Sequence, residues 1–134
     1  MKIQEFYGMY QDQRRSCLSI DQFSSLLAMY PAGLIALADG TFDQLEKQNI
    51  VSSIKEAADD ELIMCEMYKE FCYMLAADAT LRYVALECIK DEIAGKEELK
   101  DVVREIMIST AEASDDVSDE EKKAIYDMKQ MLNL

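Results

Sequence analysis

The fold is decided by residues 34–46, LIALADGTFDQLE, where an apolar segment leads into an acidic turn and a new helix begins. Residues 108–121, ISTAEASDDVSDEE, repeat the same order near the C-terminus. When Glu46 is aligned with Glu121, the copies lie 75 residues apart. Lys47 then aligns with Lys122, and Ile50 with Ile125. We interpret the two stretches as helix-turn-helix units packed around a shared middle.

Both turns carry the residues that start a helix. Asp43 and Ser118 are the predicted N-caps, because a short side-chain oxygen accepts from the free backbone N–H groups of the first turn. Three residues later, Glu46 and Glu121 complete capping boxes by reaching back to the backbone N–H of the cap. Gly40 permits a positive φ in the first turn. Helix-start chemistry alone therefore explains most of these carboxylates.

Composition indicates one globular domain built from helices. The chain has 134 residues, 50% of them hydrophobic and 31% charged, which is typical of a folded domain. One Pro and four Gly are too few for the many turns of an all-β fold, and good helix formers dominate. We therefore predict an all-α fold, a compact single-domain bundle of about seven helices with an internal pseudo-twofold repeat of the helix-turn-helix unit.

The charge balance excludes several classes of partner. Lys and Arg number 14 against 27 Asp and Glu, a formal net charge of −13, which argues against binding to nucleic acid or anionic membranes. It favours cations or basic protein surfaces as partners. The longest apolar run covers residues 30–38, far short of the roughly 20 residues of a membrane helix, and the N-terminus does not resemble a signal peptide. We expect a cytoplasmic protein without direct membrane insertion.

The spacing of apolar residues predicts the individual helices. Residues 2–15 form a short amphipathic helix on the surface of the bundle, and Ser19 starts the next helix with a capping box. Pro31 lies inside that helix and should kink it, whereas Gly33 lets another helix approach closely. Residues 62–77 are apolar nearly all round, so we expect this helix at the middle of the bundle.

The sequence also indicates a polar stripe on the helix at 62–77 and the state of the four cysteines. The helix at 62–77 has a narrow polar stripe made of Glu66, Lys69 and Glu70. No cysteine pair has the spacing of a zinc site, and the chain contains no histidine. We expect buried, reduced thiols that pack as small hydrophobic groups. These cysteines are Cys17, Cys65, Cys72 and Cys88.

Residues 37–47 and 113–122 resemble the TerB-like tellurite-resistance family. In that family an Asp-Gly turn, an apolar residue, an Asp or Ser and then Glu-Lys occur twice, once in each half. Asp116 stands where the family usually has Gly. The resemblance covers residues 20–134, so the chain divides into an N-terminal helical extension at 1–18 and a TerB-like helical domain at 19–134.

The resemblance implies an acidic cluster that binds a divalent cation. If the two copies pack about a pseudo-twofold axis, their turns approach each other, and the concentrated negative charge calls for a cation. Oxygen ligands suit Ca²⁺, Mg²⁺ or Mn²⁺ better than zinc or copper. The spacing differs from that of an EF-hand loop. The candidate ligands are Asp39, Asp43, Glu46, Asp115, Asp119 and Glu121.

The function implied by the resemblance is a non-enzymatic binding or scaffold module linked to tellurite or chemical stress and phage defence. Its expected partners are proteins, including other tellurite-resistance proteins at the membrane. The absence of histidine disfavours an enzyme, because the commonest base near neutral pH is missing. The alternative is a structural or oligomeric subunit, with capping acids only and no metal site, that makes contact through exposed Phe6, Tyr7 and Tyr10.

Overall fold

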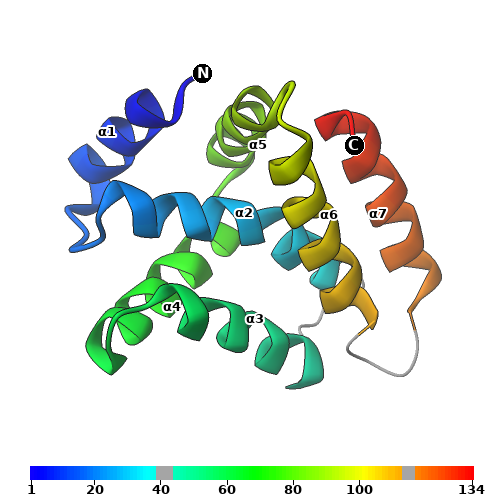
Figure 1. Ribbon diagram of the computed structural model, residues 1–134, viewed down its shortest axis with the longest axis horizontal. Coiled ribbons are helices and arrows are strands. Elements are labelled where there is room, and N and C mark those ends of the chain that lie inside the picture. Colours follow the sequence, from blue (N-terminus) through cyan, green and yellow to red (C-terminus); the bar gives the residue numbers. More distant parts are fainter. Residues whose placement is uncertain (39–43, 113–116) are drawn as a thin grey trace.

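The computed structural model describes residues 1–38, 44–112 and 117–134. These residues form seven helices and contain no strand, which confirms the predicted all-α bundle (Figure 1). The pseudo-twofold relation between the two halves stays a prediction. In chain order the helices are α1 (Ile3–Arg14), α2 (Ile20–Ala36), α3 (Gln44–Ala57), α4 (Glu61–Ala76), α5 (Ala79–Ile93), α6 (Glu97–Glu112) and α7 (Asp119–Leu132).

Helix α2 lies at the centre of the bundle and contacts every other helix (Figure 1). Its side chains Phe23, Leu26, Tyr30 and Ile35 are completely buried. The helix begins with the predicted capping box, in which the Ser19 hydroxyl accepts from the Gln22 backbone N–H and the Gln22 side chain accepts from the Ser19 backbone N–H. The helix that the sequence marks as strongly apolar and Pro-containing is therefore the one around which the others are arranged.

The expectation that residues 62–77 form the central helix is wrong. Helix α4 packs against α2, α3 and α5, and it buries one side that carries Met67, Phe71 and Met74. Leu62, on another side of the same helix, is 71% exposed. Apolar composition shows that a helix can be buried, but it does not determine how many neighbours the helix has.

Gly33 allows α2 and α4 to approach closely, as predicted. A Cβ atom built on Gly33 would lie 2.7 Å from Leu75 Cδ2 and 2.9 Å from Phe71 Cζ. Both distances are shorter than an ordinary van der Waals contact between carbon atoms. The absence of a side chain at this position therefore sets the separation of the two helices.

Helix α1 is more deeply packed than the sequence suggested. Phe6 and Tyr10 are buried, and their rings lie 5.4 and 4.9 Å from the ring of Phe23 at the start of α2. Tyr7 is half-buried and donates a hydrogen bond to the Leu18 carbonyl at 2.7 Å. The exposed aromatic surface that would support the alternative function is therefore not found on α1, because Phe6 and Tyr10 form part of the core.

The connection between α1 and α2 is held by the side chain of Gln11. Its Oε1 accepts from the Ser16 backbone N–H at 2.9 Å, and its Nε2 donates to the Ser16 carbonyl at 2.9 Å. The side-chain amide thus pairs with backbone groups that neither helix satisfies, which fixes the direction in which α2 leaves α1.

The expectation of four buried thiols is correct for Cys88 alone. Burial raises the pKa of the Cys88 thiol to about 11, so this group stays protonated at neutral pH. Cys17, Cys65 and Cys72 are exposed. Cys65 and Cys72 are exposed because α4 buries only the side that carries Met67, Phe71 and Met74.

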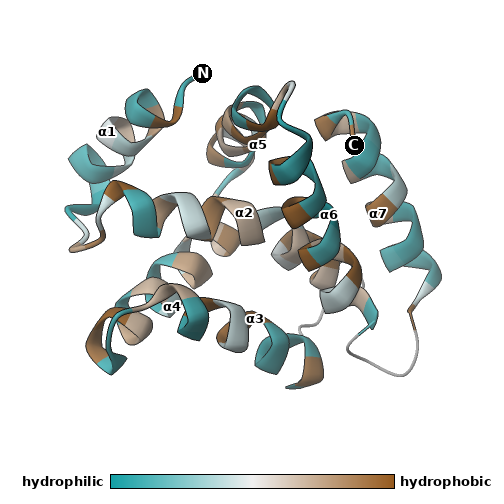
Figure 2. Ribbon diagram, in the orientation of Figure 1, coloured by the Kyte–Doolittle hydropathy of each residue, from teal (hydrophilic) through white to brown (hydrophobic). Residues whose placement is uncertain are grey.

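Helix α7 closes the bundle with an amphipathic pattern. Figure 2 shows hydrophilic residues over most of this helix and hydrophobic ones at intervals along it. Met128 and Leu132 are the residues that it buries in the core. None of the seven described helices is long and apolar enough to cross a membrane.

Candidate functional site

The chain segments that flank the two acidic turns lie close together. The Asn49 side chain in α3 donates a hydrogen bond from Nδ2 to the Thr110 hydroxyl in α6 at 2.8 Å. Thr110 is completely buried and lies in the last turn of α6. Helix α6 contacts both α3 and α7, and its last turn bonds to α3 (Figure 1). We call residues 44–49, 110–112 and 117–121, which flank the two acidic turns, the acidic corner.

Three of the six predicted metal ligands fall within the described structure. Glu46 and Glu121 are buried, with 1% and 2% exposure, whereas Asp119 is exposed. Because α3 begins at Gln44 and α7 at Asp119, both glutamates are the third residue of their helices. The remaining three predicted ligands, Asp39, Asp43 and Asp115, lie outside the described residues, as does the predicted cap at Asp43.

The start of α7 has the predicted N-cap but not the predicted capping box. The Ser118 hydroxyl accepts from the Glu121 backbone N–H at 3.1 Å. The same hydroxyl donates to Glu121 Oε1 at 3.2 Å, so the glutamate side chain pairs with the Ser118 hydroxyl and not with its backbone N–H. Glu121 Oε2 is buried and has no hydrogen-bond partner among the described residues. Burying a carboxylate oxygen without a partner costs free energy, which a donor or a cation recovers.

A complete metal-binding group is not found within residues 1–38, 44–112 and 117–134. These ranges contain no cluster of three or more acidic or cysteine side chains that could hold an ion. The predicted set takes half of its carboxylates from outside these ranges, so the six-ligand site stays a prediction. Of the six candidates, the described residues include two buried carboxylates, Glu46 and Glu121, and the exposed Asp119.

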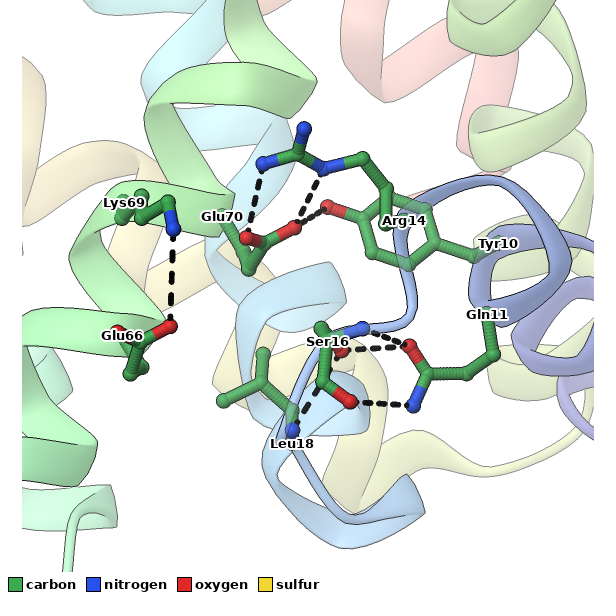
Figure 3. Close-up of polar contacts among 8 residues, drawn as sticks. All are labelled: Tyr10, Gln11, Arg14, Ser16, Leu18, Glu66, Lys69 and Glu70. Carbon is green, nitrogen blue, oxygen red and sulfur yellow. Dashed lines mark hydrogen bonds and ion pairs between the residues drawn. The ribbon is translucent and has the colours of Figure 1, made fainter.

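A second buried carboxylate site involves α1 and α4, and the sequence analysis missed it. Arg14 donates to Glu70 through Nε to Oε1 and Nη2 to Oε2, each at 2.9 Å, and Tyr10 donates to Oε1 at 2.8 Å (Figure 3). Glu70 is 2% exposed. Of the polar stripe that the sequence shows on this helix, Glu70 is therefore buried, whereas Lys69 is exposed.

Helical spacing contains the signal that identifies Glu70. The residue lies three positions after Met67 and four before Met74, on the side of α4 that packs into the core. A carboxylate on an apolar helix side is seldom buried without a partner. The cation that pairs with Glu70 is Arg14. This pairing cannot be recognised from local sequence spacing, because the two residues are 56 positions apart.

The surroundings of Glu70 keep it ionised. Burial opposes the charged form, but hydrogen bonds from Arg14 and Tyr10 outweigh it, so the pKa of Glu70 lies below its ordinary value. Burial and the bond to Glu70 raise the pKa of Tyr10, so that its hydroxyl remains a donor. The guanidinium carbon of Arg14 also lies 3.9 Å from the centre of the Tyr73 ring. These groups neutralise one another and form a structural link rather than a reactive centre.

No family model, curated protein or solved structure matches this chain.

Proposed function

We propose that this protein is a non-enzymatic, TerB-like binding module whose acidic corner holds a divalent cation. Its role is in tellurite or chemical stress and phage defence, through protein partners that include other tellurite-resistance proteins at the membrane. The observation that carries the proposal is the burial of Glu46 and Glu121 at the same place in α3 and α7. These are the two positions on which the repeated stretches were aligned.

Glu46, Glu70 and Glu121 are the buried acidic residues of the described chain. Further acids stand next to Glu46 and Glu121 in the sequence. Several carboxylate oxygens at one place are the ligands that Ca²⁺, Mg²⁺ or Mn²⁺ prefers. Glu46 and Glu121 would form the buried side of the site, and Asp119 its exposed side.

The alternative function is a structural or oligomeric subunit with capping acids only and no metal site. One observation favours it, because the hydrogen bonds between Ser118 and Glu121 position that glutamate without any ion. Gel filtration distinguishes the cation-binding module from the oligomeric subunit. A strictly monomeric protein weakens the subunit alternative.

The test is the melting temperature with Ca²⁺, Mg²⁺ or Mn²⁺ against the same protein in chelator. An ion at about 100 times its Kd stabilises the folded state by about 2.7 kcal/mol, which raises the Tm by about 10 °C for a domain of this size. We expect Glu46→Gln with Glu121→Gln to abolish this rise, and Asp39→Asn with Asp115→Asn to do the same. Glu120→Gln removes an exposed carboxylate from the same turn and should preserve it. A wild-type Tm that no ion changes would discard the cation site.

A further inference from the structure

A groove of about 420 Å³ lies between α1 and the helices α4 and α5. Its lining combines apolar and aromatic side chains with the polar Gln13, Asp78 and Thr80. It includes buried Tyr10 and also Met9, which is 51% exposed. Further apolar lining comes from Tyr73, Leu81 and Val84. All three helices contribute side chains, so the groove is suited to a ligand that presents several apolar side chains at once.

The groove is fixed in shape before anything binds. Arg14 ties the end of α1 to α4 through Glu70, and its guanidinium covers the ring of Tyr73. At the other end of α1, the Ile3 backbone N–H donates to Glu92 Oε1 at 2.9 Å, and the N-terminal amine pairs with Asp91. A preformed site binds more tightly because less conformational freedom is lost on association.

The acidic residues around the groove outnumber the basic ones. Asp78 lines it directly. On α1, Glu5 and Asp12 are exposed and lie four residues before and three after Met9, so they share its side of the helix. On α5, Glu87 lies three residues after Val84. Arg14 is neutralised by Glu70, and the exposed cations Lys2 and Arg15 stand at the two ends of α1. Along the groove itself, carboxylates lie on both α1 and α5.

We propose that this groove binds a basic amphipathic helix of a partner protein. Apolar side chains at positions i, i+3, i+4 and i+7 of such a helix enter the groove, and flanking Lys or Arg residues meet Glu5, Asp12 and Glu87. A second copy of this chain is a poor occupant, because two molecules with a net charge of −13 repel each other.

The groove and the acidic corner are separate sites. The groove lies against α1, which Figure 1 shows on the opposite side of the view from the start of α7. This inference names a partner class for the proposed binding module, but it needs no cation. Peptide binding measured in chelator therefore tests it independently of the cation proposal.

The experiment uses fluorescence anisotropy with two labelled peptides of about 14 residues, roughly 21 Å as a helix. Both carry Leu at helical spacing, and the remaining positions are Lys in one peptide and Glu in the other. We expect the full-length protein to bind the Lys peptide, with an affinity that falls as salt is added, and not to bind the Glu peptide. Failure to bind the Lys peptide, or equal binding of both, overturns the proposal.

Charge-reversal variants locate the binding. Glu5→Lys with Asp12→Lys should weaken binding of the Lys peptide about tenfold. Glu98→Lys with Glu105→Lys, on exposed positions of α6 with the same spacing and the same change in net charge, should alter it by less than about twofold. Equal losses in both pairs mean that the peptide binds the acidic surface non-specifically, which overturns the proposal.

An uncharged pair of variants tests the apolar part. Met9→Gln should weaken binding about fivefold, because it removes a groove side chain. Leu62→Gln, on an exposed residue at the start of α4, should leave binding unchanged. A thermal melt of each variant confirms that it is folded, so a loss of binding by a folded Met9 variant is assigned to the groove. Unchanged binding by that variant contradicts the proposal.

Discussion

At Glu70, a buried carboxylate keeps its charge because Arg14 and Tyr10 reach both of its oxygens. The pair is asymmetric in exposure, since the Arg14 side chain is 26% exposed and the Glu70 side chain 3%. Removing the arginine therefore strands a charge inside the protein, whereas removing the glutamate leaves an arginine that can turn towards water. The two halves of one ion pair thus have unequal effects on stability.

We predict that Arg14→Ala destabilises the protein by about 3 kcal/mol, because the buried Glu70 carboxylate loses its cation. Urea denaturation measures the change in the free energy of unfolding. Lys69→Ala is the control, since Lys69 and Glu66 form an exposed pair at 4.0 Å that is worth less than about 1 kcal/mol. Equal effects of the two substitutions would contradict a stabilising role for the buried pair.

The lowered pKa of Glu70 makes part of the stability depend on pH. A carboxyl with a folded-state pKa below its unfolded value stabilises the protein above the unfolded value, about 4.3, and loses this contribution as the pH falls through the folded pKa. The variant Glu70→Gln has no ionisable carboxyl at this position, so it lacks this pH-dependent contribution to stability. We predict that wild type exceeds Glu70→Gln in unfolding free energy at pH 6, and that the difference shrinks below about pH 4. Urea titrations across this range check the prediction, and a constant difference would refute it.

Among the elements, α2 and α4 show what apolar patterning can and cannot predict. The sequence predicted that both are helices, placed Ser19 as the cap of α2 and identified Gly33 as a point of close approach. The expectation that α4 is the central helix was wrong. Apolar composition shows how much of a helix can be buried, but it does not show how many other helices pack against it. The burial of Glu70 was missed for a related reason, since its partner lies on a helix distant in sequence.

The contact at Gly33 leads to a prediction for two glycines. Gly33→Ala places a methyl group against Leu75 and Phe71 of α4 and should cost about 1–2 kcal/mol, after allowance for the better helix propensity of Ala. Gly8→Ala in α1 meets no atom within 4 Å and should stabilise by up to about 1 kcal/mol. Thermal melts measure both changes. A gain in Tm for Gly33→Ala would show that α4 moves away at little cost.

For the molecule as a whole, composition and spacing predicted the all-α class and the seven helices of the described residues. The six-ligand metal site stays a prediction. Aligning the two repeats picked out Glu46 and Glu121, which are buried at equivalent helix positions, but nothing in the local sequence distinguishes them from exposed Asp119. Burial depends on which helices cover a turn, and that arrangement is set by long-range packing such as the bond between Asn49 and Thr110.

The exposed sulfur atoms of α4 bear on how the oligomeric state is measured. Cys65 and Cys72 are two helical turns apart, about 10 Å along the axis, which is too far for an internal disulfide. Air oxidation of these accessible groups therefore joins separate molecules, and the covalent dimers that result imitate a natural assembly. A chromatographic profile collected under dithiothreitol, or with all three exposed cysteines, Cys17, Cys65 and Cys72, changed to serine, reports the association that the fold itself produces.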